Sequence, residues 1–282
     1  MYAVTAATGQ LGRLVVEALT DHVPRSSIVA VVRDAAKASD LGVTVRQADY
    51  GDADALAAAL QGVRRVLLIA ATDMNERVRH HGNVVEAARR AGVAFLAYTS
   101  VLHADRWPVA AFRSHAETEA IVRASGLSFA ILRNGWYGEN NTIGLAQALA
   151  HGAILGAAGS GRIAWAARRD YAEAAATVLL GGDIHHGQIY ELAGDRALTL
   201  ADLAAEVSRQ TGRTVTYADL PEDAYAQVML QAGLPEPLAR VLAEVDARAI
   251  AMGLLDDESR ALSGLIGRPT TPMSETVRAA LA

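Results

Sequence analysis

The amino-terminal segment of this 282-residue chain reads Thr5-Ala6-Ala7-Thr8-Gly9-Gln10-Leu11-Gly12. It follows a strand-like run at residues 2–5 and leads into a segment whose apolar residues recur at helical spacing, namely Leu11, Val15, Val16 and Leu19. Glycines at such a turn let the backbone approach a pyrophosphate, whose charge is met by free N–H groups and the positive end of the helix dipole. Any tight strand-to-helix turn can use glycine, but this placement on the first strand favours dinucleotide binding.

Short β-branched runs alternate with helical, alanine-rich segments from residue 2 to about residue 132. This alternation is typical of repeated βαβ units and predicts an α/β fold with a doubly wound parallel sheet. Six strands are expected, at residues 2–5, 27–33, 43–46, 65–70, 93–99 and 127–132.

The alternation loosens after Asn134-Gly135, and helical patterns dominate the rest of the chain. Helices are expected at 169–180, 199–211, 221–232, 235–251 and 257–265, with short strands near 188–192 and 214–217. Thr199-x-x-Asp202 resembles a capping box at the start of one of these helices. We predict a cofactor-binding domain at residues 1–150 and a smaller, mostly helical substrate domain at residues 151–282, packed directly on it. Segments of residues 160–195 could return to the first domain.

Composition excludes several kinds of chemistry. The chain has no cysteine, so disulfides, thiolate nucleophiles and Cys-ligated metals are absent, and Lys37 is its one lysine. The net charge of −5 has no long runs of one sign, which argues against nucleic-acid and membrane partners. No apolar stretch is long enough to span a membrane, and the first strand leaves no room for a cleaved leader, so we expect a cytoplasmic protein.

The end of the second strand indicates which cofactor is bound. An NAD-preferring fold usually places an acidic side chain there for the ribose 2′-OH, whereas this chain has Arg33. A guanidinium suits a 2′-phosphate, and Lys37 could supply a second cation one helical turn later, so NADPH is favoured over NADH. The alternative is that Arg33 is a surface residue and that Asp34 takes the carboxylate role.

Other segments are expected to border the dinucleotide. Asp49-Tyr50 follows the third strand and would lie near the adenine, while Ala70-Ala71-Thr72 follows the fourth and would pass near the ribose and nicotinamide. Ala6 occupies the first glycine position of the expected Gly-x-x-Gly-x-x-Gly, where a methyl group could crowd the turn unless residue 6 has a negative φ. An Ala6→Gly variant is therefore expected to bind NADPH at least as tightly.

Further motifs extend over essentially the whole chain. They are Val32-Arg33, Val45-Arg46-Gln47-Ala48-Asp49-Tyr50-Gly51-Asp52, Tyr98-Thr99-Ser100-Val101-Leu102-His103-Ala104-Asp105, Leu132-Arg133-Asn134-Gly135-Trp136-Tyr137, and segments at 156–159, 168–171, 190–195 and 265–271. Together with the glycine loop they resemble the NmrA-like atypical short-chain dehydrogenases, above all the bacterial NADPH-dependent quinone reductases, with triphenylmethane reductases as relatives.

The resemblance implies a Rossmann-type domain, a small C-terminal substrate domain and reduction of quinones by NADPH. It also assigns a set of residues to the cofactor, namely Ala6, Thr8, Gly9, Gln10, Leu11, Arg33, Lys37, Asp49, Tyr50, Ala70, Ala71, Thr72, Ser100, Asn134, Gly135, Trp136, Tyr137 and Arg168.

The acid of ordinary short-chain dehydrogenases is missing. Those enzymes use a Tyr-x-x-x-Lys pair to protonate a localised alkoxide, whereas the corresponding helix here has His115 and Glu119 in those places. A quinone makes this acceptable, because hydride addition yields a hydroquinone anion delocalised over a ring. Candidate proton donors are His115, His103 and Tyr137, although His115 could merely hydrogen-bond a carbonyl or the ribose and His103 could be loop surface.

Asn134-Gly135-Trp136-Tyr137 follows the sixth strand, where the family wraps the nicotinamide. Two large rings beside a glycine suit stacking on a flat acceptor, although they could instead fill the core between the domains. The resemblance favours the site. His80-His81 and His185-His186 lack a third ligand at useful spacing, so we expect solvated surface and no metal.

Two further alternatives concern function. An NmrA-like protein without the catalytic pair could bind NADP as a sensor and act through a protein partner. Within the enzyme class, the arginine-over-lysine usage suggests a GC-rich genome, in which the acceptor could be a polycyclic aromatic polyketide quinone whose quinol passes to a partner hydroxylase. A homodimer is the default expectation for the assembly.

Overall fold

The computed structural model describes residues 1–282 and is built around a seven-stranded sheet in the order β3-β2-β1-β4-β5-β6-β9, in which all neighbours are parallel. The strands are β1 (Tyr2–Thr5), β2 (Ile28–Val32), β3 (Thr44–Gln47), β4 (Arg65–Leu68), β5 (Phe95–Val101), β6 (Ser128–Asn134) and β9 (Gln188–Leu192). The strand order reverses between β1 and β4, which opens a crevice at their carboxyl ends. The predicted doubly wound α/β fold is confirmed.

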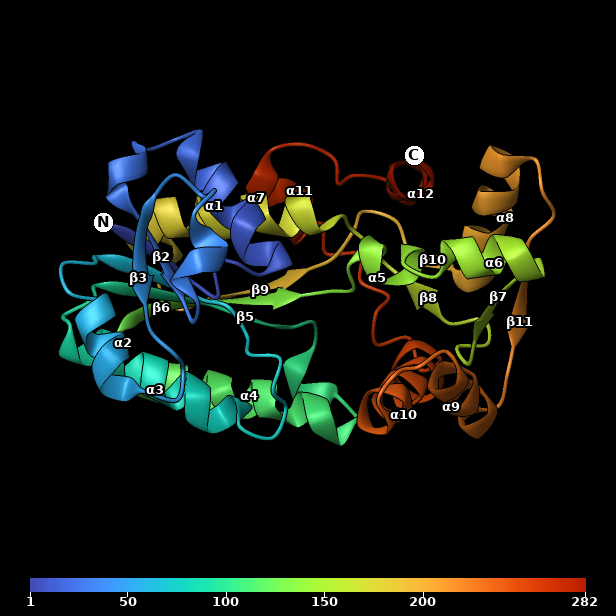
Figure 1. Cartoon of the computed structure of the whole chain (residues 1–282), viewed down its shortest axis with the longest axis horizontal. Helices are drawn as coiled ribbons and strands as arrows, with labels where there is room; N and C mark the ends of the chain where they lie inside the picture. The colour runs from blue at the N-terminus through green and yellow to red at the C-terminus, as the bar shows by residue number, and fades with distance from the viewer.

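Helices cover both faces of this sheet (Figure 1). One face carries α2 (Ala53–Ala59), α3 (Arg77–Arg90) and α4 (Ala110–Ala124), and the other carries α1 (Gln10–Thr20), α7 (Arg168–Gly181) and α11 (Ala261–Ile266). Every residue of β2 and β5 is buried, as expected for strands covered on both sides. Successive residues of β2 therefore enter two separate cores, with Ala30 under α1 and Val31 under α2 and α3.

The chain returns to the sheet after leaving it. Beyond β6 it enters the smaller half of the molecule, then comes back as α7, which packs on α1, and as β9, which pairs with β6. Both elements lie within residues 160–195. The short strand expected near 188–192 thus belongs to the main sheet. The helix expected at 257–265 is shorter and later, because only Ala261–Ile266 is helical, and this segment α11 also packs back on α7 and β9.

The smaller half lies at the carboxyl ends of the strands (Figure 1) and is mostly helical. Its helices are α5 (Gly138–Thr142), α6 (Leu145–His151), α8 (Leu200–Thr211), α9 (Glu222–Gln231), α10 (Glu236–Glu244) and α12 (Met273–Leu281). Two small sheets accompany them, one of β7 (Ala153–Gly156) with β11 (Thr216–Asp219) and one of β8 (Arg162–Ile163) with β10 (Leu198–Thr199). The predicted capping box of Thr199 and Asp202 is present at α8.

Two features of the smaller half differ from expectation. The helix expected at 235–251 is regular only as α10 and continues as a π-helical segment, η5 (Val245–Ile250). There the Asp246 carboxylate accepts the backbone N–H of Ala157 at 3.0 Å, and its burial raises the pKa of Asp246 to about 6. The second difference is that three of the four short strands, β7, β8 and β10, were not predicted.

A shared hydrophobic core joins the two halves. Val101 at the end of β5, with Leu102 and Trp107 from the loop that follows, packs with Trp165 and Leu203 of the smaller half. The Trp107 indole donates to the carbonyl of Leu102 at 2.7 Å, which fixes the ring in this shared core. No helix in the structure combines the length and the apolar character needed to cross a membrane.

Candidate cofactor and substrate cleft

The glycine loop brings the start of α1 against the end of β1. A Cβ on Gly12 would lie 2.4 Å from the Ala6 carbonyl oxygen and 2.7 Å from the Ala7 Cα, so only glycine fits there. The backbone N–H groups of Gln10, Leu11 and Gly12 have no partner within the protein, and no side chain caps the helix. These unpaired donors at a helix N-terminus are what a pyrophosphate requires.

Ala6 lies in the left-handed region, with φ of 48°. The sequence analysis expected the Ala6 methyl group to be tolerated only if residue 6 has a negative φ, and its φ in the structure is positive. The methyl group therefore strains the turn, because side chains other than glycine are disfavoured in this conformation.

Two adjoining cavities run along the carboxyl ends of the strands. The first, of about 410 Å³, extends from the glycine loop to the ends of β2 and β3, and the second, of about 460 Å³, extends from the same loop to the segment after β6. They share Ala6, Gly9 and Ala70-Ala71-Thr72. Every residue that the sequence assigned to the cofactor lines one of the two cavities, and His115 lines the second.

The far end of the first cavity carries two cations. Arg33 is exposed and makes no ion pair or side-chain hydrogen bond, and Lys37 lies one turn away in η2 (Ala35–Ala38). Asp34 is already engaged, because its carboxylate accepts the Ala36 N–H at 3.0 Å and lies 4.0 Å from the Lys37 Nζ. This arrangement favours a 2′-phosphate over a 2′-hydroxyl.

Tyr50 borders the same cavity, but its hydroxyl turns into the core. It hydrogen-bonds the Thr5 side chain and donates to the carbonyl of Ile69 at 2.9 Å. Burial raises the pKa of this phenol. Tyr50 therefore links β1 to the segment after β4.

The Ala70-Ala71-Thr72 segment is held by buried side chains of α3. His81 accepts the Ala71 N–H at Nε2, 2.9 Å away, and its Nδ1 lies 2.9 Å from the Thr118 Oγ1, which itself donates to the Ser114 carbonyl. The ring is thus neutral, with its hydrogen on Nδ1. Burial, aided by the nearby Arg77 charge, lowers the pKa of His81 to about 3.

The expectation that both histidine pairs are solvated surface is wrong. His81 and His185 are buried, and the Nδ1 of His185 lies 2.7 Å from the Tyr190 hydroxyl. Each adjacent pair has one inward and one outward member, since His80 is only partly buried and His186 is exposed. No cluster of metal-ligating side chains is present.

His115 is buried at the second cavity and is not a cationic acid. Its Nδ1 lies 2.9 Å from the Tyr98 hydroxyl, and Phe112 stacks against the ring at 6.1 Å. Burial, followed by the charge of Arg77, holds the pKa of His115 well below its usual range. The Nε2 of His115 has no hydrogen-bond partner within the protein, which leaves this nitrogen available to a ligand.

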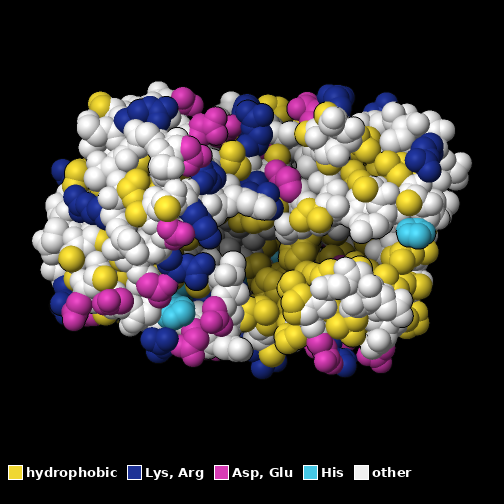
Figure 2. All heavy atoms as spheres, viewed as in Figure 1, with side chains coloured by type: hydrophobic (Ala, Val, Ile, Leu, Met, Phe, Trp, Pro, Cys, Tyr) yellow, Lys and Arg dark blue, Asp and Glu magenta, His cyan; other side chains and the backbone are white.

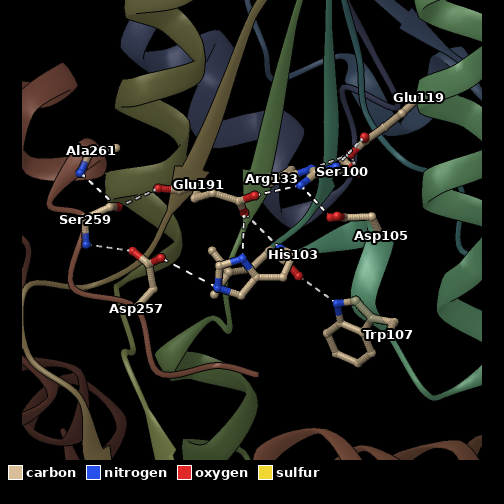
Figure 3. A network of polar contacts seen from close by, with 11 residues as sticks. Ser100, His103, Asp105, Trp107, Glu119, Arg133, Glu191, Asp257, Ser259 and Ala261 are labelled. Carbon is tan, nitrogen blue, oxygen red and sulfur yellow. Dashed lines mark hydrogen bonds and ion pairs between the residues drawn. The ribbon is translucent and has the colours of Figure 1, made fainter. Parts of the chain in front are cut away.

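His103 lies outside both cavities and belongs to a polar network that includes Arg133 and Glu191 (Figure 3). Its Nδ1 is 3.5 Å from Glu191 and its Nε2 is 3.6 Å from Asp257. The geometry places His103 in a link between the loop after β5 and the segment before α11.

Glu119, which stands where a catalytic lysine would, is part of the same network. It receives two hydrogen bonds of 2.8 Å from Arg133 and one of 2.7 Å from Ser100 (Figure 3). Arg133 also binds Glu191 and Asp105 at 2.7 and 2.8 Å. Where ordinary short-chain dehydrogenases have the catalytic lysine, this chain thus has Glu119 as a structural member of a buried ion-pair network.

The segment after β6 forms the far wall of the second cavity. The Asn134 Nδ2 donates to the Tyr137 hydroxyl at 3.1 Å, and the Arg168 guanidinium lies 4.9 Å from the Tyr137 ring centre. A Cβ on Gly135 would lie 2.9 Å from the Leu192 carbonyl oxygen. The Asn134 Oδ1 is buried without a partner, as expected of an acceptor awaiting a donor from a ligand.

Tyr137 is a poor proton donor, because burial raises the pKa of its hydroxyl, which already accepts a hydrogen bond. Trp136 is only partly buried and lines the second cavity. Among the other residues that line this cavity, sequence reasoning missed Arg77 of α3 and Phe112 of α4. A signal for the first was present: Arg77, His81, Val84, Val85 and Ala88 recur at helical spacing along the buried stripe of α3.

The parallel sheet, the glycine loop beside its switch point and the cleft along the strand ends define a dinucleotide-binding protein of the Rossmann type. The model of the NmrA-like family matches residues 2–259, and the chain belongs to that family.

Individual relatives agree with this assignment. The chain is 51% identical over 280 residues to quinone oxidoreductase 2 of Escherichia coli strain K12, which covers 98% of this chain and 97% of that protein. The crystal structure of an NADPH-dependent quinone oxidoreductase from Escherichia coli complexed with NADPH matches with a TM-score of 0.96 at 50% identity, covering 100% of both chains. Citrobacter sp. triphenylmethane reductase complexed with NADP(H) matches with a TM-score of 0.94 at 37% identity, covering 99% of this chain and 100% of that one. The family resemblance expected from the sequence is confirmed.

Proposed function

We propose that the protein is an NADPH-dependent oxidoreductase that transfers hydride directly to a quinone. The observation that carries this proposal is the continuity of the two cavities, from the cations at Arg33 and Lys37 to the aromatic wall at Phe112 and Trp136. The relatives named for NADPH-dependent quinone reduction match over the full chain, which supports the same activity here.

The residues present fit NADPH from one end to the other. Arg33 and Lys37 would hold the 2′-phosphate, and the free N–H groups of residues 10–12 would hold the pyrophosphate. The buried Oδ1 of Asn134 would accept a hydrogen bond from the carboxamide of the nicotinamide. When bound, NADPH supplies the hydride, and the protein orients it toward the space beside Trp136.

The acceptor follows from the missing acid. No tyrosine of low pKa and no lysine faces the second cavity, so a substrate that needs immediate protonation of an alkoxide is poorly served. A quinone stores the added electrons in a delocalised anion and can take its proton from water. We assign His115, through its free Nε2, to a hydrogen bond with the quinone oxygen, and we assign His103 to structure.

Shape supports a flat, apolar acceptor. Figure 2 shows a hollow between the two halves whose surface is largely hydrophobic, with basic side chains on its nucleotide-binding side. Stacking against an aromatic wall orients a planar ring without requiring many polar contacts.

The decisive experiment is anaerobic stopped-flow oxidation of NADPH, followed by its absorbance, with a panel of one-ring to four-ring quinones. We expect turnover with at least one simple benzoquinone or naphthoquinone. The rank order across the panel would show whether a polycyclic quinone is preferred. Tight NADPH binding without turnover on any acceptor would contradict the proposal and favour a sensor that acts through a protein partner.

A cytoplasmic location and a homodimer complete the proposal. The absence of cysteine and the need for NADPH are compatible with a reducing compartment. Fractionation of cells and light scattering of the purified protein test these two points separately.

A further inference from the structure

Arg77 is a buried cation that has no carboxylate partner. Its side chain makes three hydrogen bonds, and all of them go to neutral oxygens: the Ala71 carbonyl at 2.9 Å, the Ala111 carbonyl at 3.2 Å and the Ser114 hydroxyl at 3.0 Å. The other buried arginine of the chain, Arg133, binds three carboxylates. Burying a guanidinium without a counter-charge costs free energy, and a ligand that supplies negative charge would offset this cost.

Arg77 lines the second cavity, and one nitrogen of its guanidinium has no partner within the protein. Nε and Nη1 make all three hydrogen bonds, which leaves Nη2 without a partner, and this nitrogen is not enclosed by protein atoms. Arg77 lines the cavity together with Phe112, His115 and Trp136. Its charge also lowers the pKa of His115, so its field extends across this part of the cleft.

We propose that Arg77 is a catalytic residue that binds the oxygen on which negative charge develops as the acceptor is reduced. This inference rests on the proposed quinone reductase function and adds a specific electrostatic group to it. In the reaction, the C–H bond of the dihydronicotinamide breaks and its electron pair leaves with the hydrogen as hydride. The hydride forms an O–H bond to one quinone oxygen, the other quinone oxygen becomes a phenolate and the nicotinamide becomes a cation. Water then gives the phenolate a proton.

A fixed guanidinium suits this task better than an acid does. Burial lowers the pKa of Arg77 from its usual value, which for a guanidinium is high enough that the group still carries its charge near neutral pH. Its two bonds to backbone carbonyls hold it in place before the reaction begins. It would stabilise the phenolate more than the neutral quinone, which is the condition for faster chemistry. Ordinary short-chain dehydrogenases use a Tyr and Lys pair to protonate the product, whereas here Arg77 would stabilise the negative charge without transferring a proton.

The first test compares Arg77→Gln with Arg79→Gln, a matched change at an exposed arginine of the same helix that pairs with Glu76. Removing one preorganised donor at a developing oxyanion typically lowers kcat about 10²- to 10³-fold. We expect that loss for Arg77→Gln with almost unchanged NADPH affinity, measured by nucleotide fluorescence, and no loss for Arg79→Gln. Added guanidinium ion should partly restore the activity of Arg77→Ala. A parallel loss of NADPH affinity that explains the whole defect would overturn the proposal.

The second test does not depend on turnover. 4-Nitrophenol resembles the reduced acceptor, and its anion absorbs visible light. Wild-type protein with NADP⁺ bound should favour the anion and shift the titration of the phenol to lower pH, and Arg77→Gln and Arg77→Lys should weaken or abolish the shift. If the wild-type protein shows the Arg77-dependent shift but does not turn over quinones, the proposed function is refuted and the anion site at Arg77 stands. If the wild-type protein turns over quinones but does not shift the titration of 4-nitrophenol, the proposed function stands and the role of Arg77 is refuted.

Discussion

The backbone N–H of Ala71 donates to the Nε2 of His81 across 2.9 Å, in the interior of the protein. This single contact ties the segment that borders both cavities to α3. It requires a neutral ring with its hydrogen on Nδ1, because an imidazolium has no acceptor nitrogen. The shape of the cleft therefore depends on the protonation state of a residue that does not line it.

Stability should fall as the pH drops through the range in which free histidine titrates. Burial lowers the pKa of His81 to about 3 in the folded protein, whereas an unperturbed histidine titrates near pH 6.5, so below that pH the unfolded chain binds a proton that the folded chain does not. His115 acts in the same direction. The free energy of unfolding, measured by urea denaturation, should decrease by up to about 1.4 kcal/mol per pH unit for each such group. His81→Gln should flatten this slope and the exposed His186→Gln should not; equal slopes in all three proteins would contradict the prediction.

Replacing Ala6 with glycine should stabilise the protein. The φ of 48° at Ala6 is disfavoured for alanine but free of strain for glycine, and the gain is partly offset by the greater chain entropy of glycine. We expect a net increase of about 0.5 to 1 kcal/mol in the free energy of unfolding, and NADPH affinity at least equal to that of the wild type. Ala7→Gly, at a buried position without a positive φ, is the control and should destabilise. Weaker NADPH binding by Ala6→Gly would contradict the idea that the alanine strains the nucleotide-binding turn.

Gly12→Ala should damage both the fold and the nucleotide site. The added Cβ would lie 2.4 Å from the Ala6 carbonyl oxygen, so α1 must move away from β1. Overpacking of this kind destabilises by about 1 to 3 kcal/mol, and the shift should also lower NADPH affinity, measured by calorimetry. Gly264→Ala, in a helix where a Cβ meets nothing within 4 Å, is the control and should be neutral or stabilising. Normal NADPH affinity in a folded Gly12→Ala protein would show that the close packing is unnecessary.

Arg33→Asp should shift the preference between the two nucleotides toward NADH. Loss of a charge-assisted hydrogen bond to the 2′-phosphate removes about 1.5 to 3 kcal/mol, and the new carboxylate repels the phosphate while accepting from a ribose hydroxyl. The ratio of kcat/KM for NADPH to that for NADH should fall at least about tenfold. Lys37→Ala should lower the same ratio less, because its side chain is more mobile and lies beside Asp34. An unchanged ratio in Arg33→Asp would place the 2′-phosphate elsewhere.

The sheet and the nucleotide loop could be predicted because their signals are local. The alternation of β-branched and helical segments gave all six amino-terminal strands, and the residues assigned to the cofactor all line the two cavities. The carboxyl ends of parallel strands meet at one edge, so residues that follow separate strands come together without any knowledge of side-chain packing.

The remaining features depend on contacts between distant segments. The pairing of β9 with β6 is fixed by tertiary packing, and the sequence of residues 188–192 alone does not indicate which strand they pair with. The φ of Ala6 is fixed by the approach of α1 to β1, as the contact at Gly12 shows. His81 was misjudged because adjacent histidines were weighed as a pair, whereas a helix turns one inward and the other outward. Arg77 was missed because a charged residue on a helix is usually solvated.

The repeated return of the chain limits how the two halves can separate. It leaves the sheet after β6, comes back for α7 and β9, leaves again, and returns once more at α11 before ending in α12. A cut near residue 150 would therefore release no autonomous piece, since the first fragment would lack an edge strand and two covering helices. A wide hinge opening between the two halves would have to bend several of these connections at once.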